Sequence, residues 1–254
     1  MRNVPINDKE RIDDLQVPLK NGKSLCVIQN PDYFCFGVDA VLLADFAKIP
    51  KNAVVADMGC GCGVIPLLIA AKTEASHITG IEIQSEVAEM AQRSVALNGL
   101  EDKISVINAD IKRFEGSGVF DVITCNPPYK EGGGGLKNPN KYLAVARHEV
   151  CCTLSDVIKT AARLLKPGGK LNIIHRPERL ADIICGMRKN GLEPKRIRFV
   201  HPAPYKTATM VLIEGAKGGR PKLFSEPPLY IHDQNGEYSD EINRIYGKTK
   251  DKPE

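Results

Sequence analysis

From about residue 53 onward, short apolar runs alternate with segments of helical periodicity. This alternation is typical of an α/β fold, because parallel strands must be joined by crossover connections, which are usually helices. The expected strands are 53–58, 77–83, 104–107, 119–125, 170–175, 196–200 and 209–214. The expected helices run from a glycine-rich turn to about 72, and over 85–97, 153–166 and 178–190. The pattern therefore predicts a sheet with helices between its strands.

The chain of 254 residues is long enough to bury one substantial core. We interpret residues 51–222 as one domain, with an N-terminal appendage at 1–50 packed on the same core and an irregular C-terminal tail at 223–254. There is no run of 18 or more apolar residues, and the first ten residues lack the apolar region of a signal peptide. We therefore expect a cytoplasmic protein with no membrane contact.

Eight cysteines are present, yet their placement argues against a disulfide framework. Cys60 and Cys62 lie inside a glycine loop, Cys125 ends an apolar run, and Cys151 and Cys152 are neighbours. A zinc site would need paired C-x-x-C units or suitably spaced histidines, and the sequence has neither. We expect reduced thiols and no bound metal.

Basic residues gather in one late segment, although the formal net charge is only +4. Between residues 188 and 222, nine lysines and arginines stand against two glutamates, and Lys195, Arg196 and Arg198 form the densest group. Such a surface can neutralise RNA phosphates and release their counterions. The same charges are equally compatible with a solvated surface that keeps the protein soluble.

A glycine-rich loop follows the first expected strand and precedes a helix, with Asp57 at its start and Gly59, Gly61 and Gly63 within it. Glycines allow the backbone to approach a ligand closely, and a helix N-terminus favours an anionic group. Dinucleotide-binding proteins use a related turn with the spacing G-x-G-x-x-G, whereas this loop is D-x-G-x-G-x-G. The loop therefore indicates a ligand site, and its spacing differs from the dinucleotide pattern.

Two further acids follow the next two expected strands. Glu82 lies at the end of the second, where a carboxylate can accept hydrogen bonds from both hydroxyls of a ribose. Asp110 lies just beyond the third. The alternative for each is an acid that faces solvent at the end of a strand.

The segment Asn126-Pro127-Pro128-Tyr129 follows the fourth expected strand, whose carboxyl end faces the same crevice. Prolines fix the backbone and remove N–H donors, so neighbouring carbonyls can be held toward a ligand. The Asn126 side-chain oxygen and the Pro127 carbonyl can accept the two hydrogens of an exocyclic amine, and Tyr129 offers a face for base stacking. The alternative is a structural Pro-Pro turn. Four glycines at 132–135 predict a mobile loop beyond it.

The D-x-G-x-G-x-G loop resembles motif I of class I S-adenosylmethionine-dependent methyltransferases, and Asn-Pro-Pro-Tyr resembles the motif of their nitrogen-directed members. The resemblance implies a Rossmann-like fold with a seven-stranded, mostly parallel sheet, an antiparallel last strand and helices on both faces. It also implies that Asp57 orients the methionine ammonium group and that the loop amides face the methionine part. Glu82 would then hold the ribose, and Asp110 the adenine amine.

Further segments are similar to one family, the bacterial tRNA adenosine N6-methyltransferases that modify the nucleoside 3′ of the anticodon in a valine tRNA. These segments are 34–44, 146–149, 212–215 and 227–230. The resemblance implies that S-adenosylmethionine is the cofactor and tRNA the substrate, for a protein that we expect to be a monomer or a weak dimer. Asn126, Pro127 and Tyr129 would be catalytic. Phe36, Gly37 and Asn126 would join the cofactor site. The implied substrate contacts are Pro128, Tyr129, Arg147, His148, Lys195, Arg196 and Arg198.

Alternatives of other kinds remain open from the sequence. A ribosomal RNA adenine or guanine N-methyltransferase would carry the same motifs. A protein glutamine methyltransferase shares Asn-Pro-Pro-Tyr but usually has a separate N-terminal helical domain, for which fifty residues are too few. A non-catalytic RNA-binding module would retain the fold, although the intact Asn126 and Tyr129 argue against it.

Overall fold

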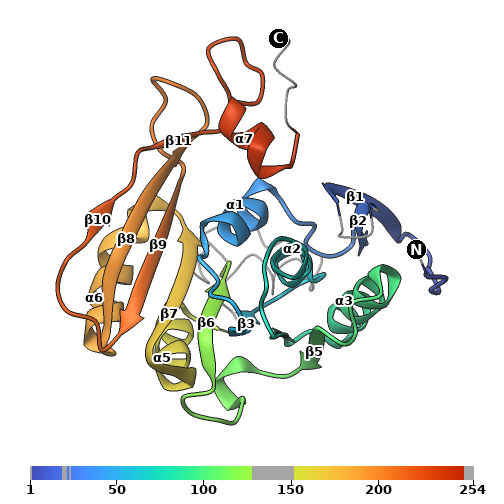
Figure 1. The fold of residues 1–254 in the computed structure, drawn as a ribbon, viewed down its shortest axis with the longest axis horizontal. Coiled ribbons are helices and arrows are strands. Elements are labelled where there is room, and N and C mark those ends of the chain that lie inside the picture. Colours follow the sequence, from blue (N-terminus) through green and yellow to red (C-terminus); the bar gives the residue numbers. More distant parts are fainter. Residues whose placement is uncertain (1, 19–21, 23, 128–151, 249–254) are drawn as a thin grey trace.

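The computed structural model describes residues 2–18, 22, 24–127 and 152–248. Its centre is a nine-stranded sheet in the order β10-β8-β9-β7-β6-β3-β4-β5, with β11 also paired to β8 (Figure 1). The strands are β3 (Val54–Met58), β4 (His77–Glu82), β5 (Ile104–Asn108), β6 (Phe120–Cys125), β7 (Leu165–His175), β8 (Leu192–His201), β9 (Met210–Lys217), β10 (Phe224–Ser225) and β11 (Leu229–Tyr230).

The seven predicted strands all occur, and five of them, β5, β4, β3, β6 and β7, run parallel. The seventh, β9, is antiparallel to both β7 and β8, so the predicted mostly parallel α/β sheet is confirmed. The sheet is wider than predicted, because β10 and β11 pair with the edge strand β8. At these two strands the predicted irregular tail after residue 222 is wrong. The sequence did not reveal them, because each strand is only two residues long and carries no periodic signal.

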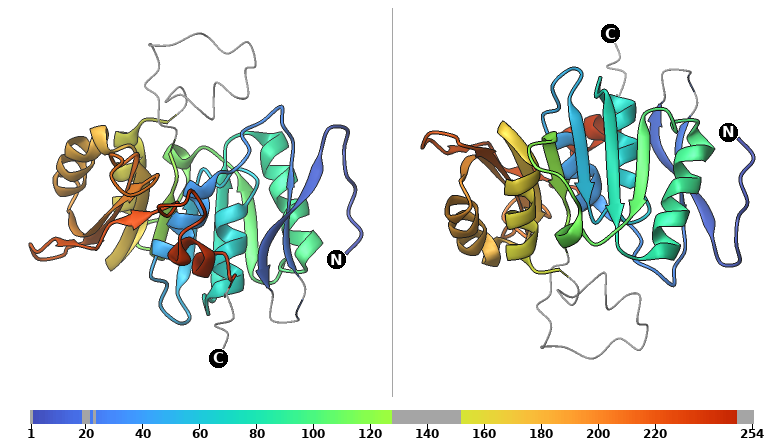
Figure 2. Two further views of the ribbon diagram at one scale, coloured as in Figure 1. Left: turned by 90° about the horizontal axis from the view of Figure 1, so that it is seen from above. Right: turned by 90° about the horizontal axis from the view of Figure 1, so that it is seen from below.

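Helices cover both faces of the sheet, as predicted, and the strands lie between two groups of them (Figures 1 and 2). One group is α1 (Val38–Phe46), α2 (Val64–Lys72), α3 (Ser85–Asn98) and α7 (Asp240–Ile245). The other is α5 (Leu154–Leu164) and α6 (Leu180–Lys189). Each group packs on its own cluster of buried apolar residues. A capping box begins α5, where Thr153 and Asp156 exchange hydrogen bonds.

The N-terminal segment contributes residues to the buried apolar cluster that α1 and α2 share. Its hairpin, β1 (Arg11–Pro18) and β2 (Ser24–Gln29), lies beside α3 (Figure 1). The Asn98 side chain of α3 holds β2 with two hydrogen bonds to one residue, because its Oδ1 accepts from the Cys26 N–H at 3.0 Å and its Nδ2 donates to the Cys26 carbonyl. Leu25 and Ile28 are fully buried in the cluster that also contains α1 and α2.

The order of the strands places the ligand crevice. The chain passes from β3 outward to β4 and β5, and then returns to add β6 on the other side of β3. In open α/β sheets this reversal opens a crevice at the carboxyl ends of the strands, where ligands bind. Among the described residues, no helix has both the length and the apolar character needed to span a membrane.

Candidate functional site

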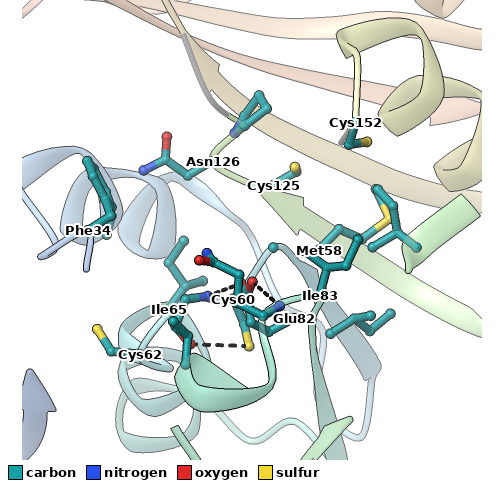
Figure 3. Close-up of a pocket in the computed structure, with 18 of the residues that line it drawn as sticks. Phe34, Met58, Cys60, Cys62, Ile65, Glu82, Ile83, Cys125, Asn126 and Cys152 are labelled. Carbon is teal, nitrogen blue, oxygen red and sulfur yellow. Dashed lines mark hydrogen bonds between the residues drawn. The ribbon is translucent and has the colours of Figure 1, made fainter. Parts of the chain in front are cut away.

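A cavity of about 450 Å³ lies at the carboxyl ends of β3, β4 and β6 (Figure 3). This volume suits a small organic ligand, since such sites usually occupy roughly 300–1,000 Å³. The predicted site residues that line it are Phe36, Gly59, Gly61, Glu82, Asp110, Asn126 and Pro127. Residues that follow four separate strands therefore meet in one cavity, as the sequence predicted.

The glycine loop is shaped by backbone conformation. Gly59 and Gly61 have φ values of +73° and +53°, which residues with a Cβ rarely adopt, and a Cβ on either would meet open space. The Gly59 and Cys60 N–H groups donate to the Ile81 carbonyl at 2.8 and 3.0 Å, and the Gly61 N–H donates to Glu82 Oε2 at 3.0 Å. These amides bind the end of β4, which corrects the expectation that they face the ligand.

Gly63 does not line the cavity, contrary to the prediction. It begins α2 with φ +88°, and its N–H donates to the Cys60 carbonyl at 2.9 Å. A Cβ at this position would lie 3.4 Å from the Ala91 side chain of α3. Gly63 therefore allows α2 to begin directly after the loop and to pack close to α3.

Glu82 is held firmly at the wall of the cavity. It is buried, and its two carboxylate oxygens accept from the Gly61 and Gln84 N–H groups, each at 3.0 Å. Burial raises the pKa of Glu82, while these two backbone donors act in the opposite direction. The side chain projects from the end of β4 toward the cavity (Figure 3). Glu82 is thus an oriented acceptor for hydroxyl groups of a ligand.

Asp57 is placed differently, although it also lies near a strand end. It is fully buried and is absent from the cavity wall, whereas its neighbour Met58 lines the cavity. Because successive side chains of a strand point to opposite faces, Asp57 is directed elsewhere, and its Oδ1 accepts from the Thr124 hydroxyl at 2.7 Å. Burial raises the pKa of Asp57 to about 7. Asp57 therefore does not line the cavity, and its contact with an ammonium group stays a prediction.

Asp110 lines the cavity and also caps a short 3-10 helix at 111–113. Its Oδ1 accepts from the Lys112 N–H at 2.9 Å, and its Oδ2 lies 3.6 Å from Lys112 Nζ. Its side chain thus has a fixed direction beside the cavity.

Asn126 follows β6 and lines the cavity together with the buried Pro127. Its side-chain nitrogen donates to Asp39 Oδ2 at 3.0 Å. Asp39 is 7% exposed, in the first turn of α1. Sequence reasoning missed Asp39, and the signal that was available is an acid at the start of an otherwise apolar helix.

Gly37 was predicted to contact the cofactor, but it does not line the cavity. It precedes α1, and a Cβ on it would lie 3.0 Å from Asp39 Oδ1. Phe34 and Arg176 line the cavity and were not among the predicted site residues. Arg176 follows β7, where no motif marked it.

Cys60, Cys62 and Cys125 line the cavity (Figure 3), and the cysteines in the described part of the chain are free thiols. Burial raises the pKa of the Cys62 thiol to about 12 and those of Cys60 and Cys125 well above their ordinary value. Since the thiolate is the nucleophile and the metal ligand, these protonated thiols form a neutral wall.

Four predicted substrate contacts and the glycine run 132–135 lie outside the described residues. These contacts are Pro128, Tyr129, Arg147 and His148. Their roles stay predictions.

The basic segment on β8 is largely neutralised within the protein. Arg196 donates to Glu214 at 2.9 Å and to Glu226 at 2.8 Å, and its guanidinium lies 4.2 Å from the centre of the Phe46 ring. Arg198 donates to Glu241 at 2.8 Å. The guanidinium groups of Arg196 and Arg198 are therefore paired with carboxylates of the protein, and their role as RNA contacts stays a prediction.

Lys195 is engaged less tightly. Its Nζ donates to the carbonyl of Arg220 at 2.8 Å, and no carboxylate pairs with it among the described residues. Its role as an RNA contact stays a prediction.

Two solved structures with a similar fold are described as methyltransferases. A protein of Agrobacterium tumefaciens, described as a predicted O-methyltransferase, superposes with a TM-score of 0.66 at 27% identity and covers 83% of this chain and 96% of its own. A 16S rRNA N2 methyltransferase of T. thermophilus, in complex with AdoMet and guanosine, has a TM-score of 0.59 at 19% identity. It covers 84% of this chain and 52% of its own. At that identity the second likeness concerns the fold alone.

Relatives of similar sequence are also named as methyltransferases. A tRNA1(Val) (adenine(37)-N6)-methyltransferase of Phocaeicola vulgatus is 32% identical over 177 residues, which are 70% of this chain and 74% of its own length. A protein of the same name from Porphyromonas gingivalis is 31% identical over 222 residues, or 82% of this chain and 86% of its own. Residues 26–186 match the family model described as methyltransferase small domain. The chain therefore belongs to the methyltransferase small domain family.

Proposed function

We propose that this protein transfers a methyl group from S-adenosylmethionine to the exocyclic N6 of an adenine in tRNA, at the position 3′ of the anticodon. The observation that carries the proposal is the meeting of Glu82 and Asn126-Pro127 in one cavity at the carboxyl edge of the sheet. Relatives at 26–32% identity that span most of the chain and are named tRNA1(Val) (adenine(37)-N6)-methyltransferase support this acceptor.

The cavity residues fit the proposed cofactor. The Glu82 carboxylate, held by two backbone N–H groups, suits the two hydroxyls of a ribose. Phe34, Phe36, Ile83 and Ile111 supply apolar walls for an adenine, with Asp110 beside them as an acceptor for its amine. The open space beside Gly59 and Gly61 suits the methionine part. When bound there, S-adenosylmethionine supplies an electrophilic methyl group on a positively charged sulfur.

The chain's own contribution to the chemistry is orientation. An adenine N6 amine is a poor nucleophile, because its lone pair is delocalised into the ring. The Asn126 side-chain oxygen and the Pro127 carbonyl accept its two hydrogens and localise the lone pair toward the methyl group. S-Adenosylmethionine held in this cavity would supply the methyl group to the new N–C bond, and the electrons of its S–C bond would stay with the departing sulfur. The methylated ammonium then releases a proton to water, so the reaction needs no strong base from the protein.

The RNA contacts beyond the cavity are proposed for the segment that begins at Pro128. Tyr129 would stack on the target base, while Arg147 and His148 would lie near its entrance. With Arg196 and Arg198 paired to carboxylates, Lys195 is the residue of the predicted basic group whose charge is least committed. Acting on tRNA, the protein would work in the cytoplasm.

The test is a methylation assay with the purified full-length protein. It is incubated with S-adenosylmethionine carrying a deuterated methyl group and with unmodified tRNA or ribosomal RNA. Nucleosides are then identified by mass spectrometry, and the modified position is mapped in oligonucleotide digests. We expect labelled N6-methyladenosine from a valine tRNA, next to the anticodon. Label found instead in N2-methylguanosine of ribosomal RNA would overturn the proposed acceptor.

A further inference from the structure

A buried acid on α1 reaches the end of β6 across 87 residues of sequence. Asp39 Oδ2 accepts the hydrogen bond from Asn126 Nδ2 at 3.0 Å, and Asp39 Oδ1 accepts from the Ala40 N–H at 2.9 Å. Burying a carboxylate is costly unless it is hydrogen-bonded. The remaining buried residues of α1 are apolar, so packing of this helix does not itself require an acid.

The chemistry of the two groups decides how the amide is turned. An asparagine amide has a donor end and an acceptor end that differ little in shape, whereas a carboxylate only accepts hydrogen bonds. The nitrogen of Asn126 must therefore face Asp39, and its oxygen is directed away from Asp39.

We propose that Asp39 is a positioning residue for methyl transfer, which holds the Asn126 amide so that its oxygen is presented to the target amine. This inference rests on the proposed function, because it assumes that Asn126 accepts a hydrogen from that amine. It assigns to α1, in the N-terminal part of the chain, an effect on the catalytic step that is exerted through Asn126.

Gly37 has a place in the same arrangement. Its φ of −116° is accessible to any residue, so the backbone does not require a glycine. A Cβ there would nevertheless lie 3.0 Å from Asp39 Oδ1 and 3.8 Å from its Cγ, and the Asp39 side chain would have to shift. The glycine thus leaves room for the carboxylate that turns Asn126.

The test compares Asp39→Asn with Asp45→Asn, the same isosteric change on the same helix. Asp45 lies 3.9 Å from Lys72 and outside the cavity. We expect Asp39→Asn to lower kcat by roughly 10- to 100-fold, the effect of one hydrogen bond to a charged group. The Kd for S-adenosylhomocysteine, from calorimetry, should change less than about threefold. Asp45→Asn should leave both quantities near the wild-type values.

A double-mutant cycle separates positioning from a structural role. Single-turnover rates are measured for the wild type, Asp39→Asn, Asn126→Ala and the double variant. If Asp39 acts through Asn126, then Asp39→Asn changes the rate little once Asn126 is gone. An equal loss in both backgrounds would overturn the inference and leave the proposed function intact. Full activity of Asn126→Ala would instead overturn the catalytic role of Asn126, on which the inference depends.

A readout without activity comes from nuclear magnetic resonance. The side-chain amide signal of Asn126 is identified by its loss in Asn126→Ala. We expect this signal to shift in Asp39→Asn and in Gly37→Ala, where the added methyl group displaces the carboxylate, and to stay in place in Asp45→Asn. Gly37→Ala should lower kcat several-fold with little change in cofactor affinity. An unmoved Asn126 signal in Asp39→Asn, or a Gly37→Ala variant that loses cofactor affinity alone, would overturn the assignment.

Discussion

The polar side chains at the carboxyl edge of the sheet and those on β8 differ in how their hydrogen bonds are arranged. Glu82 and Asn126 are each fixed by partners on one side and line the cavity on the other. Arg196 is enclosed instead by two carboxylates and an aromatic ring, at 12% exposure of its side chain. A polar residue that is oriented by its neighbours and still faces a cavity serves a ligand, whereas an enclosed one serves stability. The comparison can be tested by substituting residues at the carboxyl edge of the sheet and on β8.

The largest effect is expected for Asn126→Ala on the cavity side. Loss of the amide removes a contact that matters in the transition state, so kcat should fall by about 100-fold or more while cofactor Kd stays within about tenfold. Steady-state methylation and calorimetry measure the two quantities. Equal losses in kcat and cofactor affinity would mean that Asn126 mainly shapes the cofactor pocket.

Arg196→Ala tests the enclosed side. Without the guanidinium, Glu214, which is 1% exposed, keeps Lys170 at 3.3 Å as its remaining ion pair among the described residues. We expect the free energy of unfolding to fall by about 3 kcal/mol, the usual cost of removing one partner of a buried pair. Denaturant titration measures it, and tRNA affinity of the folded variant should change less than about twofold.

Lys195→Ala is the matched control for Arg196→Ala, on the neighbouring residue of the same strand. Its stability should stay within about 0.5 kcal/mol of the wild type. If Arg196→Ala kept its stability and lost RNA affinity, Arg196 would serve RNA binding, and β8 would not differ from the cavity edge in the way proposed.

Glu82→Gln tests whether Glu82, in the wall of the cavity, binds the cofactor. Glutamine replaces one acceptor oxygen by an NH2 group, although both oxygens now accept from backbone N–H donors. Both oxygens would also face the ribose in the proposed function. We expect cofactor affinity to fall by roughly 10- to 100-fold in calorimetry. Glu89→Gln, an exposed change on α3, should leave it within about twofold. Unchanged affinity in Glu82→Gln would remove Glu82 from the cofactor site.

The smallest effect is expected for Asp57→Asn and depends on pH. Because burial raises the folded-state pKa of Asp57 from 3.8 to about 7, its contribution to stability is complete below pH 4 and is lost as the pH rises through 7. Asparagine does not titrate, so the variant should gain stability relative to the wild type between pH 5 and pH 7, on the order of 1–2 kcal/mol. Denaturant titrations at the two pH values measure this difference. A pH-independent difference would show that the Asp57 carboxyl is ionised throughout that range in the folded protein.

Much of the fold was predictable because its signals are local. Short apolar runs marked β3, β4, β5 and β6, and the helix expected over 153–166 marked α5. Parallel strands that follow each other through helices have their carboxyl ends at one edge, so Glu82, Asp110 and Asn126 were expected to converge. The strands β10 and β11 were not predicted, because two residues show no periodicity and their pairing depends on β8.

The sequence by itself determined the class of fold, the place of the glycine loop and the set of strand ends that build the cavity. Tertiary structure decided which side chains at those ends face the ligand. It turned Asp57 toward Thr124, joined Asp39 to Asn126 and enclosed Arg196 between Glu214 and Glu226. The physical reason is range: periodicity and caps act within a few residues. These partners lie 18 to 87 residues apart, and only packing brings them within hydrogen-bond distance.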